Sequence, residues 1–444
     1  MDNKLQIRSR IRCPNCWAEM NPADLLWVSS HPDLLGDPLL CQDAQKRFLP
    51  SRFDVDGFAI DAHGMRCHTL ACPKCHLAIP RILLEFRPLF LSIIGAPSSG
   101  KSYFLASSVW ETRQRLQKFH VNFTDADPVA NQVIGDYEKK LFLSDEPDKI
   151  VAILKTEEDG ELYQSVDYGT RQELYSRPFV FSMQPKPQHP SMTRRADISV
   201  RNVSRALCLY DNAGEHFQPK LASALSPATD HLALSQVLLY VFDPLQHPKF
   251  RHQCRQHSTD PQLSPDFNTY RQDEVLLEAT KRIRQKANLP QHEQLPQPLV
   301  VVVNKFDVWS RMIPELDLQQ LDPYELTPEG MGMNRRLLDG VSAKLRKLLA
   351  VFAPEVVAAC DSVSNDITFV PVSPQGCSPE VGEGLLGVRP RNVQPIWAEV
   401  PLMYAISRAK CLLVPTAVQR SRSDEEECSE PTQAWPPRVY KGAS

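Results

Sequence analysis

The most constraining feature of the sequence is an eight-residue segment, GAPSSGKS, at residues 95–102. An apolar run, PLFLSIIG (88–95), precedes it, and a helix-compatible segment follows it. This order matches the GxxxxGK[ST] pattern of a phosphate-binding loop. Glycines let the backbone turn its N–H groups toward phosphate oxygens, and the following helix adds its positive amino-terminal end. The segment therefore predicts a strand–loop–helix unit that binds phosphate.

Each residue type in this loop has an expected role. Lys101 would reach the β- and γ-phosphates of a nucleotide, and the Ser102 hydroxyl would ligate Mg²⁺. The predicted nucleotide-binding residues of the segment are Gly95, Ala96, Pro97, Ser98, Ser99, Gly100, Lys101, Ser102 and Tyr103.

Apolar runs recur beyond residue 88 at intervals typical of alternating strands and helices. Their β-branched and aromatic content predicts strands buried on both faces of a parallel sheet. The strand runs are 88–95, 177–183, 205–211, 236–243, 298–304 and 367–373, and helical patterns cover 103–118, 272–287 and 334–353. The alternation predicts an α/β fold with a doubly wound, mostly parallel sheet, as in a P-loop NTPase.

A second motif, NKFD, indicates which nucleotide the loop binds. It follows the buried run VVVV and matches the NKxD pattern of GTPases. The Asp307 carboxylate can accept hydrogen bonds from N1–H and the exocyclic amine of guanine, whereas adenine would leave it unpaired. Asn304 would brace the phosphate loop, and the stem of Lys305 would lie over the base. These residues predict guanine specificity.

Two further loops follow predicted strands in the order expected of such a site. DNAG, at 211–214, fits DxxG: Asp211 would hold Mg²⁺ through water, and the Gly214 N–H would respond to the γ-phosphate. By itself DNAG is equally typical of a turn. The segment VPVSPQG (370–376) would supply Ser373 and Pro374 to the guanine side.

Asp211 lies 110 positions after Lys101, and the segment between them must contain a switch I threonine for Mg²⁺ and the γ-phosphate. Thr156 is favoured because it follows a short apolar run. Thr170 and Thr193 are the alternatives.

Two CPxC pairs, Cys13/Cys16 and Cys72/Cys75, predict a four-thiolate zinc site in a zinc-ribbon-like domain. The 55 residues between the pairs form a loop or insert, in which Cys67 and His68 offer substitute ligands. His76 offers another, and Cys41 could join a second site. A closed site of this kind serves folding or docking rather than catalysis. Buried free cysteines and a redox pair are the competing interpretations.

Composition limits the class and the partners. The chain has 444 residues, 42% of them hydrophobic, and a net charge of −3, which gives no general argument for a polyanionic partner. A basic run, Lys4 to Arg12, leaves nucleic acid open but is more typical of a solvated or protein-docking surface. The sequence shows neither a signal peptide nor a membrane-spanning run, which predicts a cytoplasmic protein. The expected division is 1–87, zinc-ribbon-like; 88–415, P-loop domain with a large switch I insert; and 416–444, a disordered tail.

With GAPSSGKS, DNAGE and NKFD in this order, the sequence resembles the translation-factor-like and Ras-like (TRAFAC) class of P-loop GTPases over roughly residues 88–415. With ACPKCH ahead of that domain, the layout is similar to the bacterial double-GTPase family. The resemblance implies a Mg²⁺-dependent GTP/GDP switch in a bacterial conflict (defence) system, with a protein effector or a second GTPase as partner.

The sequence departs from this class after DxxG, where Ras-like GTPases have a glutamine that orients the attacking water. Here the position is Glu215, whose charge near the γ-phosphate is unfavourable, and His216 or a partner would take over. We therefore expect slow intrinsic hydrolysis, with Lys101, Glu215, His216 and Thr156 as the catalytic residues. The alternative function is a zinc-ribbon adaptor for protein or nucleic acid, with nucleotide as a regulatory ligand.

Overall fold

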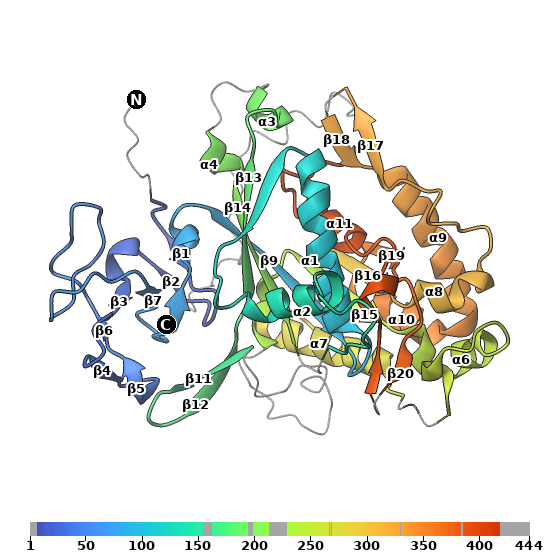
Figure 1. The fold of residues 1–444 in the computed structure, drawn as a ribbon, viewed down its shortest axis with the longest axis horizontal. Helices are drawn as coiled ribbons and strands as arrows, with labels where there is room; N and C mark the ends of the chain where they lie inside the picture. The colour runs from blue at the N-terminus through green and yellow to red at the C-terminus, as the bar shows by residue number, and fades with distance from the viewer. Residues whose placement is uncertain are drawn as a thin grey trace.

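The computed structural model describes residues 7–153, 162–193, 199–212, 229–265, 267, 269–328, 330–382 and 385–417. A seven-stranded sheet forms the centre of the molecule, with helices packed on it and a cysteine-rich module at one side (Figure 1). Across the sheet the strands are β10 (Val121–Asp125), β13 (Phe179–Pro185), β14 (Arg205–Asp211), β9 (Arg87–Gly95), β15 (Val237–Phe242), β16 (Leu299–Val303) and β19 (Ile367–Pro371).

The sheet is mostly parallel, as predicted. The five strands from β14 to β19 run in one direction, and β13 runs antiparallel to both of its neighbours. The apolar run at 177–183 does form a strand, but not a parallel one. Its apolar character reports burial on both faces and carries no information about direction. The edge strand β10 was not predicted, because exposed residues interrupt its apolar ones.

The three predicted helices are present within two residues of their expected bounds. The helices are α1 (Lys101–Lys118), α2 (Gln132–Phe142), α3 (Pro190–Thr193), α4 (Val200–Val203), α5 (His231–Leu234), α6 (Pro248–Cys254), α7 (Gln272–Ala287), α8 (Phe306–Trp309), α9 (Arg335–Phe352), α10 (Pro354–Val363) and α11 (Val400–Arg408). Helices α1 and α11 pack together, and α11 also packs on β15 and β16. Helices α5 and α7 pack on β9, and α9 packs on β19.

The amino-terminal module is built from short strands. They are β1 (Ile11–Arg12), β2 (Glu19–Met20), β3 (Leu26–Val28), β4 (Leu35–Asp37), β5 (Cys41–Gln45), β6 (Arg47–Phe48), β7 (Leu70–Ala71) and β8 (Ala78–Ile79). Three hairpins project elsewhere: β11 (Tyr163–Asp167) with β12 (Gln172–Ser176), β17 (Tyr324–Thr327) with β18 (Gly330–Met333), and β20 (Glu380–Gly382) with β21 (Leu385–Gly387).

Alternate residues of β14 face two different cores. Leu207 and Leu209 belong to the main core, whereas Ala206, Cys208 and Tyr210 belong to a second core. This is the alternation expected of neighbouring side chains on opposite faces of a sheet. The second core also contains the buried cysteines of the amino-terminal module. The module therefore covers one face of the sheet beside β14 and shares a core with it.

None of the helices in the described part of the chain is both long enough and apolar enough to cross a membrane. Of the predicted tail, Thr416 pairs with Met333 and the Ala417 N–H donates to the Met333 carbonyl at 2.8 Å. The remainder of the tail, 418–444, lies outside the described residues.

Candidate functional site

Three of the predicted loops meet in one pocket of about 220 Å³. The loops follow the carboxyl ends of β9, β16 and β19. The strands of this sheet that come next in the chain, β10, β13 and β14, lie on one side of β9, and the later strands β15, β16 and β19 lie on the other side. The strand order therefore reverses at β9, and α/β sheets usually bind ligands at such a point, outside the carboxyl ends of the strands. The predicted residues that line the pocket are Pro97, Ser98, Ser99, Gly100, Lys101, Ser102, Tyr103, Asn304, Lys305, Asp307, Ser373 and Pro374.

The phosphate-loop segment has a backbone that few sequences can adopt. Ser98 (φ 57°) and Gly100 (φ 86°) both have left-handed conformations, and Gly100 caps α1. The Lys101 ammonium donates hydrogen bonds to the carbonyls of Gly95 at 3.0 Å and Ala96 at 2.9 Å. Its side chain is buried, so the charge is held inside the loop beside the amino end of the helix.

Asn304 joins the phosphate loop to the NKFD segment. Its side-chain amide donates to the Ser99 carbonyl at 2.8 Å, which is the predicted brace. Its side-chain oxygen accepts from the Lys305 N–H, and its carbonyl accepts from the Trp309 indole at 2.7 Å. A second brace was not predicted: the Gln246 amide donates to the Pro97 carbonyl at 3.0 Å.

Substituting Gly100 tests whether the hydrogen bond from Asn304 to the phosphate loop requires a glycine at position 100. A Cβ at Gly100 would lie 2.5 Å from the Asn304 amide nitrogen, in a left-handed conformation. We expect Gly100→Ala to lower the free energy of unfolding by about 1–3 kcal/mol through backbone strain, with the clash adding to it. Denaturant titration followed by circular dichroism measures this.

Gly135→Ala is the matched control, because nothing lies within 4 Å of a Cβ built at Gly135 inside α2. This change is expected to leave stability unchanged or raise it, since alanine is the better helix former. Equal effects from the two substitutions would contradict the proposed strain at Gly100.

In the same pocket, Asp307 is held by the loop after β19. The Ser373 hydroxyl donates to Asp307 Oδ1 at 2.5 Å and accepts from the Gly376 N–H at 2.9 Å. Burial raises the pKa of Asp307, the Ser373 hydrogen bond opposes this, and the charge of Asp260 raises it further. Asp307 and Ser373 are therefore hydrogen-bonded to each other in the wall of one pocket.

Asp260 and Gln262 also line the pocket, and no sequence motif marks them. Asp260 is 4% exposed, and its Oδ2 atom has no hydrogen-bond partner among the described residues. Gln262 Oε1 accepts from the Lys305 ammonium at 2.6 Å, and Asp243 forms an ion pair with the same ammonium. Both residues come from the connection between α6 and α7: Gln262 lies in a short 3-10 helix, Pro261–Leu263, and Asp260 caps the start of that helix.

Asp211 ends β14, next to the strand that leads into the phosphate loop. It pairs with Ile93 in the parallel ladder and is 2% exposed. Burial raises the pKa of Asp211 to about 6, and the positive charge of Lys101 acts against that rise. Its Oδ1 atom has no hydrogen-bond partner among the described residues. A buried carboxylate with an unused oxygen beside the loop can act as a ligand for a cation.

The predicted switch and catalytic-loop residues, with the alternative threonines, separate into two groups. Thr156, Gly214, Glu215 and His216 lie outside the described residues. The alternative threonines do not line the pocket: Thr170 lies in the turn between β11 and β12, and the Thr193 hydroxyl donates to the Pro190 carbonyl in α3.

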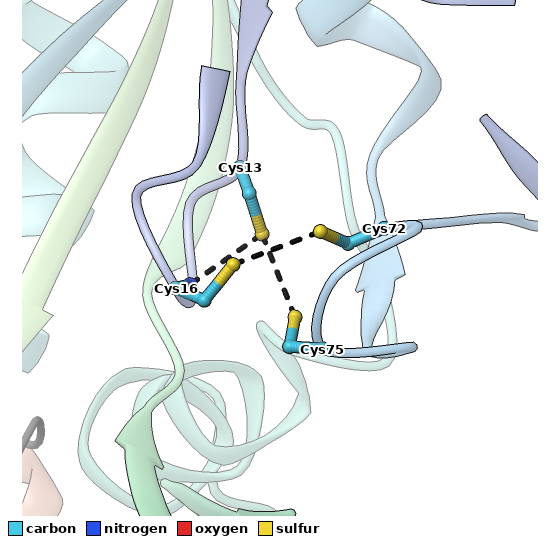
Figure 2. Close-up of side chains that lie close together, drawn as sticks. All are labelled: Cys13, Cys16, Cys72 and Cys75. Atoms are coloured by element: carbon cyan, nitrogen blue, oxygen red, sulfur yellow. Dashed lines mark hydrogen bonds between the residues drawn. The ribbon is translucent and has the colours of Figure 1, made fainter. Parts of the chain in front are cut away.

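The four predicted cysteines converge in the amino-terminal module (Figure 2). Their sulfur atoms all lie within 4.8 Å of one another and are buried. The Cys13–Cys75 and Cys16–Cys72 sulfur pairs are 3.8 Å and 3.6 Å apart. A tetrahedral site with metal–sulfur distances of about 2.3 Å has sulfur–sulfur edges of about 3.8 Å. The cluster therefore has the spacing that a single metal ion requires.

The two CPxC turns have the same local geometry. Cys13 and Cys72 each accept a backbone N–H two residues ahead, at 3.4 Å and 3.3 Å. Trp17 and His76, directly after the second cysteine of each pair, both have positive φ. This equivalence is typical of paired metal-binding knuckles.

The competing ligands lie elsewhere. The imidazole of His76 contacts the Asp37 carboxylate at 2.8 Å, and His68 packs against Phe58. Cys67 is buried near Asp61, and Cys41 is exposed. None of these four belongs to the cluster among the described residues.

An aromatic contact connects the cysteine module to the sheet beside Asp211. The Tyr210 hydroxyl donates to the Pro14 carbonyl, inside the first knuckle, at 2.7 Å. Trp17 packs against Tyr210 and Phe90, and His231 stacks on Tyr210 with ring centres 4.5 Å apart. The neighbouring residues Tyr210 and Asp211 thus contact the module and the phosphate-loop region, respectively.

Comparison with known proteins leaves the family open. No protein-family model and no curated protein matches the sequence. Among solved structures, Sup35 complexed with GDP matches at 12% identity and a TM-score of 0.21, covering 65% of this chain and 38% of Sup35. The S. cerevisiae Ski7 GTPase-like domain bound to GDP and inorganic phosphate matches at 13% identity and a TM-score of 0.25, covering 72% of this chain and 50% of that one. The chain thus spans half or less of these solved chains, and TM-scores this low carry no functional argument.

Proposed function

We propose that this protein binds and hydrolyses GTP and acts as a molecular switch. One observation carries the proposal: loops marked separately in the sequence at 97–103, 304–307 and 373–374 line a single pocket, and Asn304 bonds two of them together. Accidental matches to three motifs would have no reason to share one pocket.

The phosphate end of the pocket fits a Mg²⁺-bound triphosphate. The Lys101 ammonium and the amino end of α1 would bind the β- and γ-phosphates. Ser102 and Asp211 would hold Mg²⁺, the second through its unpartnered Oδ1 atom or a water. The bound cation would neutralise phosphate charge during transfer.

The base end fits guanine rather than adenine. Asp307 would accept hydrogen bonds from N1–H and the exocyclic amine, and Ser373 keeps its carboxylate oriented. Asp260, which lines the same pocket with an unpartnered oxygen, would accept the second amine hydrogen. Adenine offers no donor pair to these two carboxylates, so it would leave buried charge unpaired.

Four other features of this function are also proposals. Slow hydrolysis follows from Glu215, and the cysteine cluster would hold a structural zinc ion. The division into 1–87 and 88–415 and the role within a bacterial double-GTPase conflict system, with an effector or second GTPase, remain predictions.

The proposal is tested by removing the Lys101 ammonium. Lys101→Ala is expected to abolish GTP binding in a fluorescent-nucleotide titration and to abolish phosphate release. Lys118→Ala, at the other end of α1, is the matched control and should bind as the unaltered protein does. Displacement of bound GDP by ATP as effectively as by GTP would overturn the base assignment.

The raised pKa of Asp211 makes Mg²⁺ binding pH-dependent. Only the ionised carboxylate can hold the cation, so apparent Mg²⁺ affinity should fall as pH drops below about 6, by about tenfold per unit. Titrating Mg²⁺ into the GDP complex from about pH 5 to about pH 8, on both sides of that pKa, measures this. Asp211→Asn should bind Mg²⁺ weakly at every pH; a pH profile unaltered by this substitution would exclude Asp211 as the titrating group.

A further inference from the structure

A second pocket, of about 600 Å³, lies at the other end of β9 from the phosphate loop. Residues from the start of the cysteine module form one wall, and the amino-terminal part of β9 forms another. The remaining walls come from 233–236, ahead of β15, and 296–297, ahead of β16. The pocket therefore lies at the amino ends of the parallel strands, whereas the proposed nucleotide site lies at their carboxyl ends, and the two are separate.

Arginines dominate the charge of this pocket. Arg8, Arg10, Arg12 and Arg87 line it, and Glu19 is the only carboxylate among its described lining residues. Glu19 is paired with Arg12. Within the described part of the chain, neither Arg10 nor Arg87 has an ion pair or a side-chain hydrogen bond. Three positive charges in this pocket thus have no carboxylate partner among the residues that the structure describes.

Arg8 shows the electrostatic cost of this arrangement. It is partly buried, and its guanidinium has one long hydrogen bond, to the Phe86 carbonyl at 3.4 Å. Burial lowers the pKa of Arg8, and the charges of Arg87, Arg201, Arg205 and Arg12 lower it further. A desolvated cation among like charges is unfavourable unless an anion compensates it.

The pocket also has an apolar wall and an unused acceptor. Pro88, Phe90 and Leu234 line it, and Gln297 Oε1 is buried without a hydrogen-bond partner among the described residues. A concave site of this size with apolar walls and a few convergent polar groups is typical of small-molecule binding.

We propose that this pocket binds a small phosphorylated ligand with at least two negative charges, held by Arg8, Arg10 and Arg87. Guanidinium groups match phosphate oxygens with paired hydrogen bonds, and the apolar wall would contact the rest of the ligand. A nucleic-acid strand is disfavoured because the arginines converge on one pocket and the whole chain carries a net charge of −3. The proposal does not depend on GTP binding.

Calorimetric titration with inorganic pyrophosphate, in Mg²⁺-free buffer, tests the site. The full chain carrying Lys101→Ala is used, so that the phosphate loop does not compete for the probe. Adding Arg10→Ala and Arg87→Ala should weaken pyrophosphate binding by about tenfold or more for each arginine removed. The matched control is Arg335→Ala with Arg336→Ala on α9, which should leave binding unchanged.

Absence of pyrophosphate binding, or equal binding by the two double variants, overturns the proposal. If the protein binds a uridine oligonucleotide through Arg10 and Arg87 but does not bind pyrophosphate, the ligand is a nucleic acid. That result also overturns the proposal. If the unaltered chain does not bind GTP but pyrophosphate binding still depends on the arginines, only the proposed GTPase function is overturned.

A second measurement separates a binding site from a structural cluster. Because the pocket arginines repel one another in the ligand-free protein, the double variant Arg10→Ala with Arg87→Ala should have a higher melting temperature than the parent protein when no ligand is present. Pyrophosphate should raise the melting temperature of the parent protein and not that of this variant. A lower melting temperature for the ligand-free variant would mean that these arginines stabilise the fold, which contradicts the proposal.

Discussion

Asp307→Asn is expected to weaken GDP binding by a factor of about 10²–10⁴. The carboxylate would accept two hydrogen bonds from the base, and each bond to a charged group is worth about 1.5–3 kcal/mol. An asparagine side chain can offer its oxygen to only one of these donors and turns its amide hydrogens toward the other. Competition with a fluorescent GDP analogue measures the loss.

Asp260 gives this experiment a more specific outcome. Xanthine carries a carbonyl where guanine carries the exocyclic amine, so the amide introduced by Asp307→Asn could donate to it. The Asp260 carboxylate would still face that carbonyl, because both residues line the pocket and the charge of Asp260 acts on position 307. We therefore expect the single Asp307→Asn variant to bind XDP poorly, and the double variant with Asp260→Asn to bind XDP better than GDP.

The inosine nucleotide is the internal control. IDP lacks the exocyclic amine, so Asp260→Asn should weaken GDP binding and leave IDP binding unchanged. Equal losses for GDP and IDP would show that Asp260 acts on the fold of the pocket rather than on the amine. Unaltered GDP binding by Asp307→Asn would exclude Asp307 from base recognition.

Removal of the proposed zinc ion is expected to unfold the cysteine module. Structural zinc sites contribute about 10–16 kcal/mol of apparent binding free energy in small zinc peptides, which is comparable to the whole stability of a typical domain. We expect one zinc ion per chain by elemental analysis, and a lower melting temperature with a strong chelator or in Cys72→Ser. Trp17, packed on Tyr210 beside the first knuckle, should report the change by a red shift of its fluorescence.

Cys67→Ser is the matched control for this prediction. Cys67 is as buried as the four cysteines of the cluster but lies outside it. The variant should keep its zinc, whereas Cys72→Ser should lose it. Full zinc content in Cys72→Ser, or none in the unaltered protein, would contradict the metal assignment.

Residue type and spacing in the sequence were sufficient to predict which motif residues lie close together in the fold. Asn304 and Asp307 follow a buried strand at the spacing of NKxD, and the structure brings them to the pocket of the phosphate loop. The CPxC pairs predicted the cysteine cluster equally well, because a turn with two residues between the cysteines directs both sulfur atoms toward the same point.

The remaining parts depend on contacts between segments that have no shared pattern. Asp260 reaches the pocket from the start of a short 3-10 helix between α6 and α7. Arg87 lines the same pocket as Arg10 only because the module folds back on the sheet. In RALCLYD (205–211), apolar residues on both faces indicate burial but do not identify what covers each face. The cover on one face is the cysteine module, which could be recognised only in three dimensions.

That cover limits how the protein can be shortened. A chain that begins at residue 88 would leave Ala206, Cys208 and Tyr210 facing water from the middle of a sheet. An apolar sheet surface of this kind promotes aggregation. The smallest fragment that remains soluble should therefore retain the knuckles, even in experiments concerned only with nucleotide. Poor solubility of a fragment without the module would then reflect the loss of the core that the module shares with the sheet, and not a defect in nucleotide binding.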